Sequence, residues 1–363
     1  MAFRNQKTDR IGRLAQCVNL AILALVLTAC SPKMTQLTME PLEFAGIRTA
    51  DGVKVQTMDP ELLFNDGAEA FKAGDFDQAA RFFSVVCERF PDSSFGPPAL
   101  FNLGLARLRH GRPADAATAF RRFLEKFPGE GDIEQVRLRL AEALLESGDW
   151  AAAESVLGAM MVAAAPRPAV ELEIRAGLAR ALRKQGRLKE SMDQVDAAMQ
   201  VYDRHLVDPD IKGNFHAAMA SFEGGEVWHD LFASIKFILP KDRMEKDLSD
   251  KGTMFIKAQA GYMRTVRVGN IFWASKAGVR IGQLYEEFYD DIMKAEVPPE
   301  LDDHQLGQYM AELRRQARPL LSKSIELYER NMKVARSYGA KDEWFADMKA
   351  RLDRLKELLK GIE

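Results

Sequence analysis

Residues 74–79, Gly-Asp-Phe-Asp-Gln-Ala, decide the fold, because the same pattern returns at regular intervals along the chain. It reappears at residues 111–116 (Gly-Arg-Pro-Ala-Asp-Ala), 148–153 (Gly-Asp-Trp-Ala-Ala-Ala) and 186–191 (Gly-Arg-Leu-Lys-Glu-Ser), at intervals of 37, 37 and 38 residues. A glycine suits the end of a helix where a positive φ is required, and the small residue that closes each pattern lets helices approach closely. The pattern therefore predicts a series of helix pairs, each turning at its glycine.

The helix that follows each of the first two glycines carries further matching residues. Phe83 and Phe120 stand four positions after the small residue, and Pro91 and Pro128 close each pair where the chain cannot continue as helix. The third pattern keeps its aromatic residue and alanine but lacks the phenylalanine, and the fourth retains only the glycine and helical periodicity. The prediction is strongest for the first two pairs.

These repeats resemble the tetratricopeptide repeat, in which Gly67 and Gly104 fill the small position of the first helix. The usual period is about 34 residues, so the extra residues indicate longer turns. The segments Val85–Pro91 and Phe123–Pro128 have the Phe-Pro ending of tetratricopeptide proteins of the bacterial periplasm and outer membrane, including a lipoprotein subunit of the β-barrel assembly machine. The resemblance covers roughly residues 59–205. It implies an all-α fold, a tetratricopeptide-type α-solenoid of helical hairpins.

The N-terminal stretch has the features of a lipoprotein signal peptide. Leu27-Thr28-Ala29-Cys30 reads as a lipobox, and the apolar core Leu20–Leu27 is too short to span a bilayer. A basic head precedes it, formed by Arg4, Lys7, Arg10 and Arg13. The stretch resembles those of bacterial lipoproteins, which implies that Cys30 is the first mature residue and carries covalent lipid. Ser31 after the cysteine implies, by the same resemblance, the periplasmic face of the outer membrane. A plain secretory peptide is the alternative.

Composition divides the chain into four parts: signal peptide 1–29, tether or linker 30–58, four repeats 59–206 and helical extension 207–363. Residues 1–29 carry four of the 51 Lys and Arg and one of the 53 Asp and Glu, so 47 and 52 remain in the mature chain. A net charge near −5 argues against a nucleic-acid partner. Alternating residues around Asp51-Gly52 leave a small hairpin possible within the linker.

Helical periodicity continues beyond the repeats and predicts longer helices stacked on the end of the solenoid, which they would cap. Pro319 should kink or divide the third of them. The apolar stripe that runs from Ile281 to Ile292 is interpreted as core. The predicted helices are Met244–Val268, Asn270–Lys294, Leu301–Tyr338 and Asp342–Ile362. The stretch Trp273–Pro299 with its following helices is similar in texture to gliding-motility lipoproteins of myxobacteria.

A search for catalytic motifs finds no foundation for the common hydrolase, metalloprotease, nucleotide-binding or redox chemistries. The five histidines are scattered, and residues 208–213 are interpreted as a helix-starting turn rather than a calcium loop, because Lys212 occupies a ligand position. Gly224-Gly225 is interpreted as a break between helices, with an anion-binding turn as the alternative. Cys87 is expected to be a buried, unreactive thiol. We therefore expect no enzyme, no metal and no cofactor beyond the lipid on Cys30.

The resemblance implies a binding groove lined by the first helix of each pair. Asn102 and Arg139 fall where related chaperone-binding repeats hold a peptide carboxylate, although the other clamp positions do not match. The basic run from Arg180 to Lys189 is interpreted as a solvated face, with an acidic partner or anionic lipid as the alternative. The predicted groove residues are Phe64, Asn65, Phe71, Lys72, Phe101, Asn102, Leu105, Leu108, Arg109, Arg139 and Glu142.

The sequence thus predicts a non-catalytic, lipid-anchored scaffold that binds and organises proteins of a cell-envelope complex, such as a motility or outer-membrane assembly machine. Its partners would be proteins or peptides in the groove and the membrane through the lipid, with no nucleic acid and no small-molecule substrate. Two alternatives remain: a peptidoglycan-active enzyme with a catalytic fold in residues 207–363, or a promiscuous periplasmic chaperone.

Overall fold

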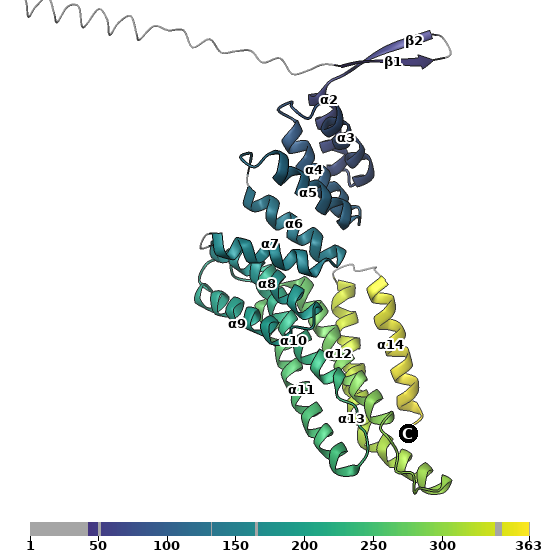
Figure 1. Ribbon diagram of the computed structural model, residues 1–363. Coiled ribbons are helices and arrows are strands. Elements are labelled where there is room, and N and C mark those ends of the chain that lie inside the picture. The colour runs from purple at the N-terminus through teal and green to yellow at the C-terminus, as the bar shows by residue number, and fades with distance from the viewer. Residues whose placement is uncertain (1–42, 50–51, 132, 164–165, 338–342, 363) are drawn as a thin grey trace, which may run out of the picture. The chain divides into compact units, whose positions relative to one another are not determined.

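The computed structural model describes residues 43–49, 52–131, 133–163, 166–337 and 343–362. Over these residues the protein has thirteen helices and one pair of strands (Figure 1). The chain divides into two compact units between Asp59 and Pro60, and each unit is described by itself.

The first unit contains an antiparallel hairpin of β1 (Glu43–Thr49) and β2 (Gly52–Met58). Its register pairs Glu43 with Met58 and Thr49 with Gly52. The hairpin that the alternation around Asp51-Gly52 left open is therefore present inside the segment interpreted as linker. Residues 1–42, which hold the predicted signal peptide, Cys30 and most of the tether, lie outside the described residues, so lipidation stays a prediction.

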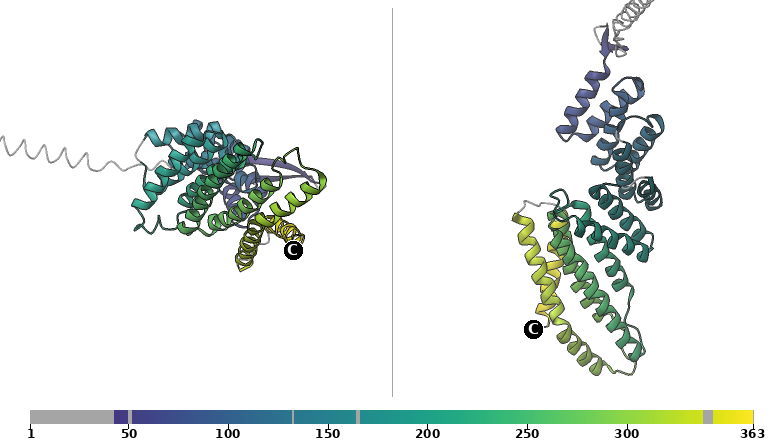
Figure 2. Two further views of the ribbon diagram at one scale, coloured as in Figure 1. Left: turned by 90° about the horizontal axis from the view of Figure 1, so that it is seen from below. Right: turned by 90° about the vertical axis from the view of Figure 1, so that its left-hand side faces the viewer.

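The second unit begins with four helical hairpins, as the repeats predict. Each consists of two antiparallel helices packed side by side, and successive hairpins stack on one another (Figures 1 and 2). The pairs are α2 (Pro60–Lys72) with α3 (Phe76–Arg89), α4 (Gly96–Arg109) with α5 (Pro113–Lys126), α6 (Ile133–Ser147) with α7 (Trp150–Ala163), and α8 (Pro168–Lys184) with α9 (Leu188–Arg204). The fold class predicted from the glycine rhythm is confirmed.

The repeat glycines have the conformation that their positions demand. Gly74, Gly111, Gly148 and Gly186 have φ values of +82°, +74°, +80° and +77°, which other residues rarely adopt. Gly104 serves a different purpose, because a Cβ atom there would lie 2.5 Å from the ring of Phe120. The repeats thus depend on glycine both for their turns and for close contact between the helices of a pair.

Five more helices follow: α10 (Phe215–Ser234), α11 (Lys241–Val268), α12 (Ile271–Met293), α13 (Asp303–Ser337) and α14 (Glu343–Lys360). Four of them match the predicted helices to within a few residues. The sequence analysis missed α10, because Gly224-Gly225 lies inside this helix and is neither a break nor a turn. Helix α13 also runs through Pro319 without dividing.

The longer helices cap the solenoid by burying its last apolar face. Helix α10 packs against both α8 and α9, and α11 and α12 pack against α10. One core cluster joins Leu172 of α8 and Met199 of α9 with Tyr262 of α11 and Ile281 of α12. A separate cluster centred on Tyr328 holds α12, α13 and α14 together. In the described part of the chain, none of the helices combines the length and apolar character needed to span a bilayer.

Candidate functional site

The three phenylalanines of the predicted groove lie within the packing between helices. Phe64 contacts Phe83 and Phe95, with ring centroids 5.6 and 5.5 Å apart. Phe101 contacts the fully buried Phe120 at 5.8 Å. Phe71 of α2 likewise packs edge-on against Phe76 of α3 at 5.2 Å. These half-buried rings join the helices of a pair.

The remaining members of the predicted set divide between the surface of the repeats, the packing between helices and a hollow. Asn65, Lys72 and Arg109 are exposed, whereas Asn102 and Leu105 are half-buried and Leu108 is buried. Arg139 and Glu142 of α6 are different, because both line a hollow of about 430 Å³. They are the two predicted residues that the structure brings into this hollow.

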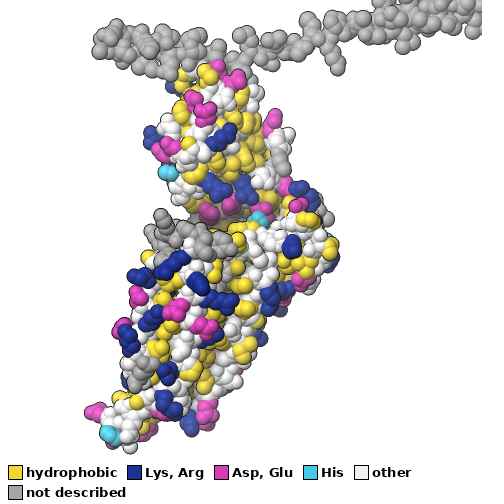
Figure 3. Space-filling model, turned by 180° about the vertical axis from the view of Figure 1, so that it is seen from behind, with side chains coloured by type: hydrophobic (Ala, Val, Ile, Leu, Met, Phe, Trp, Pro, Cys, Tyr) yellow, Lys and Arg dark blue, Asp and Glu magenta, His cyan; other side chains and the backbone are white. Residues whose placement is uncertain are grey.

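This hollow, which we call the junction hollow, forms where the repeats meet the C-terminal helices. Its walls come from α6, α8, α10 and α12, with one residue from α7. In the space-filling view, acidic and basic side chains gather around an indentation between the repeats above and the longer helices below (Figure 3). The lining residues are Leu138, Arg139, Ala141, Glu142, Leu145, Glu146, Leu157, Glu173, Gly177, Arg180, Phe215, His216, Met219, Phe272, Trp273 and Lys276.

A second hollow of about 460 Å³ continues the first along α8 and α12. The two share Arg180 of α8 and Trp273 and Lys276 of α12, together with Leu145 and Glu146 of α6. The shared residues lie where the two hollows adjoin, and we call the two hollows together the groove.

The α6 side of the junction hollow is a set of neutralised charges. Arg139 forms ion pairs with Glu142 and, at 2.7 Å, with Glu173 of α8. Burial raises the pKa of Glu173 above its usual value, although the charge of Arg139 opposes this. His216 of α10 lies 3.8 Å from Glu173, yet burial, with the charges of Arg139 and Arg180, lowers the pKa of His216 to about 4. The guanidinium of Arg139 is therefore occupied by carboxylates of the chain itself.

On the side of the hollow nearest α12, two cations have fewer contacts with carboxylates than Arg139 has. Arg180 donates from Nε to Glu223 of α10 at 2.8 Å, and its guanidinium carbon lies 5.4 Å from the centroid of Trp273. Lys276 Nζ lies 4.4 Å from the ring centroid of Phe272 and 5.0 Å from that of Trp273. Burial lowers the pKa of Lys276, and the charge of Arg180 lowers it further. Two like charges thus lie over one indole ring.

Aromatic rings line the hollow beside these cations. Phe215 of α10 stacks on Phe272 of α12 with centroids 5.8 Å apart and planes 26° apart. Both rings are largely exposed, at 42% and 51%, whereas Trp273 is only 2% exposed. The site therefore offers an accessible flat apolar surface next to positive charge, a combination that suits a peptide segment.

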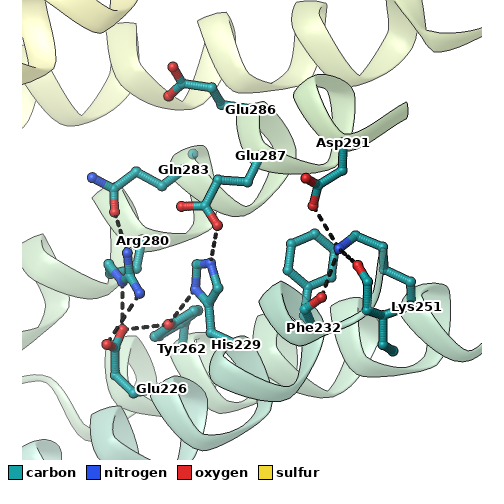
Figure 4. Close-up of polar contacts among 12 residues, drawn as sticks. Glu226, His229, Phe232, Lys251, Tyr262, Arg280, Gln283, Glu286, Glu287 and Asp291 are labelled. Atoms are coloured by element: carbon teal, nitrogen blue, oxygen red, sulfur yellow. Dashed lines mark hydrogen bonds and ion pairs between the residues drawn. The ribbon is translucent and has the colours of Figure 1, made fainter. Parts of the chain in front are cut away.

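A buried polar network fixes α12 against α10 and α11 (Figure 4). Because Trp273 and Lys276 belong to α12, the network also constrains their positions. Tyr262 of α11 donates to Glu226 of α10 at 2.6 Å and lies 2.8 Å from a ring nitrogen of His229. Arg280 of α12 forms an ion pair with the same Glu226. Burial alone would raise the pKa of Glu226, but the charge and hydrogen bonds of Arg280, with those of Tyr262 and Arg183, hold it below its usual value.

A second part of the network anchors the other end of α12. The other ring nitrogen of His229 lies 2.8 Å from Glu287. Lys251 of α11 is fully buried, lies 2.7 Å from Asp291 of α12, and donates to the carbonyls of Phe232 and Ile235. Because removing one partner of a buried pair leaves an uncompensated charge, these contacts constrain the position of α12 strongly.

The interpretation of the basic run of repeat four as a solvated face is correct for Lys184, Arg187 and Lys189, which are exposed, and wrong for Arg183. Arg183 is 9% exposed and pairs with Glu223 and Asp230, both at 2.9 Å. Arg180, on the same helix, pairs with Glu223 at 2.8 Å. The arginines on α8 thus hold α10 in place, and this explains why they cluster in the sequence.

The other features singled out by sequence have structural explanations. Asp208 accepts from the backbone of Asp210 at 3.0 Å, and Asn214 caps α10, so residues 208–214 form a turn that leads into a helix. Cys87 is 4% exposed, and burial raises the pKa of its thiol to about 11. Over the described ranges, no three His, Cys, Asp or Glu residues are grouped to hold a metal ion.

Comparison with known proteins agrees with the repeat architecture. The family model described as "Tetratricopeptide repeat" matches residues 64–131 and 101–168. "Outer membrane protein assembly factor BamD" of Pasteurella multocida (strain Pm70) is 29% identical over 105 residues, which is 29% of this chain and 40% of that protein. The match therefore spans less than half the length of this relative.

Among solved structures, MamA residues 41-end from Desulfovibrio magneticus RS-1 has a TM-score of 0.37 and 18% identity, covering 55% of this chain and 96% of its own. A tetratricopeptide repeat protein from Parabacteroides merdae ATCC 43184 has a TM-score of 0.38 and 14% identity, covering 83% and 97%. The chain contains tetratricopeptide repeats and is similar to a bacterial protein that carries them.

Sequence reasoning missed most of the junction hollow because its residues come from helices far apart in the chain. The contributions of α10 and α12, above all His216, Trp273 and Lys276, follow no repeat spacing. One pattern could have drawn attention to them: Phe272-Trp273 followed by Lys276 places an aromatic pair and a cation on one side of a helix.

Proposed function

We propose that this protein is a non-catalytic scaffold of the bacterial cell envelope that binds a segment of another protein in the junction hollow. Tetratricopeptide repeats characteristically provide surfaces for protein–protein interaction. The observation that carries the proposal is the exposed, stacked pair of Phe215 and Phe272 in the junction hollow, beside Lys276, which has no ion-pair partner among the described residues.

A place in the envelope is supported by two independent features. The similarity to an outer membrane protein assembly factor concerns the repeats, and the lipobox at Leu27–Cys30 lies outside them. We propose that Cys30 carries lipid, that the tether positions the repeats on the periplasmic side of the outer membrane, and that the bound partner belongs to an assembly or motility complex.

The binding role is tested by capture from detergent-solubilised envelopes of the source bacterium. The full chain and its Phe215→Ala/Phe272→Ala variant serve as baits, and an Ile256→Ala/Leu248→Ala variant is the control because those side chains are exposed on α11, away from the hollow. A partner retained by the wild type and control but lost from the hollow variant supports the proposal. Identical captures by all three baits contradict it.

The anchor is tested separately with Cys30→Ser. Wild-type protein should incorporate radiolabelled palmitate and fractionate with the outer membrane, since each buried methylene contributes about 0.8 kcal/mol to membrane binding. The variant should lose the label. Label that persists in the variant would remove Cys30 as the acylation site.

A further inference from the structure

We propose that the middle of the groove, at Arg180, Trp273 and Lys276, binds the carboxylate of an acidic side chain in an internal segment of the partner protein, with an adjacent apolar side chain on Phe215 and Phe272. This inference rests on the proposed function and specifies the chemistry of the partner. The residues involved lie on α8, α10 and α12, which the sequence alone did not assign to one site.

The charges of the groove leave a positive site without a counter-ion. Glu142, Glu173, Glu223 and Glu226 are each held by an arginine of the chain. Lys276 contacts only aromatic rings and has no carboxylate within ion-pair distance in the part of the chain described. Among the described residues that line the groove, Glu146 is the carboxylate without an ion pair to an arginine, and burial, with the neighbouring charge of Glu142, raises its pKa. Lys276 is therefore the cation at the centre of the groove that an external anion can reach.

Hydrogen-bond donors around the same point also lack acceptors. Trp273 is 98% buried, yet its indole N–H has no hydrogen-bond partner among the described residues. A buried N–H without an acceptor costs free energy, so such a group marks a place where an acceptor is missing. The one hydrogen bond of Arg180 over the described ranges uses Nε, so its two terminal nitrogens have no acceptor there either. Trp273 and Arg180 line both hollows, so a carboxylate bound there would lie beside these donors.

Repulsion between Arg180 and Lys276 also favours the binding of an anion at this point. Arg180 and Lys276 lie over the same indole ring at 5.4 and 5.0 Å from its centroid. The charge of Arg180 is one reason why the pKa of Lys276 is lowered. An anion bound between them relieves this repulsion, because each cation is attracted more strongly to a negative charge than to the face of the indole ring.

The shape of the groove determines which kind of carboxylate fits. The junction hollow and its continuation share Arg180, Trp273 and Lys276, so the groove extends past them in both directions. Because a hollow lies on each side of these residues, we infer that a bound segment lies across them, from one hollow to the other. The free carboxyl end of a chain would use only one of these two directions, whereas an internal Asp or Glu uses both.

The test is a selection from a library of displayed random dodecapeptides with constant Gly/Ser spacers on both sides, so that no free terminus is presented. The bait is the full chain in detergent. Selected sequences are then synthesised with blocked ends, and each is paired with a version in which Glu or Asp is replaced by the amide. Affinities are measured for wild type, Lys276→Gln and the matched control Lys257→Gln, which removes a lysine that lies over Trp228 at 4.2 Å on another surface.

We expect an acidic residue next to an apolar one in the selected peptides. Its replacement by the amide should weaken binding to wild type about ten-fold, as the loss of a charge-assisted hydrogen bond implies. Lys276→Gln should prefer the acid over the amide clearly less than wild type does, with Arg180 accounting for the preference that remains, and Lys257→Gln should discriminate as wild type does. Selection without acidic residues, unchanged discrimination by Lys276→Gln, or tighter binding of free-carboxyl than of blocked peptides would overturn the inference.

Failure here is distinguishable from failure of the proposed function. If the hollow variant loses its partner from envelope extracts while Lys276→Gln keeps the full acid preference of wild type, the hollow still binds protein and only the carboxylate chemistry is removed. If the hollow variant captures everything that wild type captures, the proposed function itself fails.

Discussion

Protonation of His216 should destabilise the fold, because this half-buried ring lies at the junction hollow near the cations Arg139 and Arg180. Burial, followed by the charges of Arg139 and Arg180, lowers its pKa from 6.5 to about 4. Glu173 at 3.8 Å is too far for a hydrogen bond and is already bridged to Arg139 at 2.7 Å, so it does not reverse this effect. The other charged groups that line the same hollow are Glu142, Glu146, Arg180 and Lys276.

The sign of the pH effect follows from the direction of this shift. The folded pKa is below the unfolded value, so the unfolded chain binds the proton more readily. The contribution to stability is fully present above pH 6.5, declines as the pH falls, and is lost once the pH is below about 4. At about 1.4 kcal/mol per pKa unit, the full contribution is roughly 3 kcal/mol and the loss at pH 5 is about 2 kcal/mol.

The assay compares wild type with His216→Gln by denaturant unfolding at pH 7 and pH 5, and follows histidine ring protons by NMR. Carboxylates titrate in both proteins, so the difference between their pH dependences isolates His216. We expect the variant to lose about 2 kcal/mol less than wild type between the two pH values. The resonance that is missing from the variant should titrate near 4 in wild type. Equal pH dependences, or a midpoint near 6.5 for that resonance, would refute the reasoning.

Three further predictions concern the scaffold. Gly104→Ala should destabilise the protein by about 1–2 kcal/mol in thermal unfolding, because the new methyl group meets the Phe120 ring. The control Gly158→Ala, which has open space around it, should be neutral or stabilising. Equal effects of the two substitutions would contradict the packing argument. Asp291→Asn should lower the free energy of unfolding by about 3–5 kcal/mol, because it leaves buried Lys251 without its counter-charge. The same change at exposed Asp353 should lower it by less than about 0.5 kcal/mol. A small effect of Asp291→Asn in denaturant unfolding would show that Lys251 is not held as described. Cys87, with a pKa of about 11, should resist thiol reagents at pH 8 in a Cys17→Ser/Cys30→Ser chain until denaturant is added; fast labelling of the native protein would show that the thiol is accessible.

The repeats were predictable because each of their constraints is local. A glycine with positive φ and a small residue opposite an aromatic ring recur at fixed spacing, so Gly74 and Gly104 could be assigned from sequence. The boundaries of α11 to α14 followed from apolar periodicity and from breaks such as Gly269.

Helix α10 escaped prediction because two glycines normally indicate a turn, and the reason for them is tertiary. A Cβ atom on Gly225 would lie 2.6 Å from the ring of Tyr262, so Gly225 permits α10 and α11 to cross closely. The junction hollow was missed for a similar reason. Its central pair, Arg180 and Lys276, are brought together only when α12 folds back onto the repeats.

Phe64 and Phe101 show what an alignment on a family pattern cannot predict. Alignment placed Phe64 and Phe101 on the first helix of their pairs, which is correct, but it could not determine which way their rings pack. The ring of Phe101 is directed at buried Phe120, so Phe101→Ala would damage the core and would be a poor test of binding.

The most direct test of the central claim is site-specific photo-crosslinking in living cells. A photoreactive amino acid replaces Phe272, which is 51% exposed in the junction hollow, and, as a control, Ile256, which is 66% exposed on α11 and does not line the hollow. We expect a discrete crosslinked partner from position 272 and none of that mass from position 256. No crosslink from 272, or the same products from both positions, would contradict it.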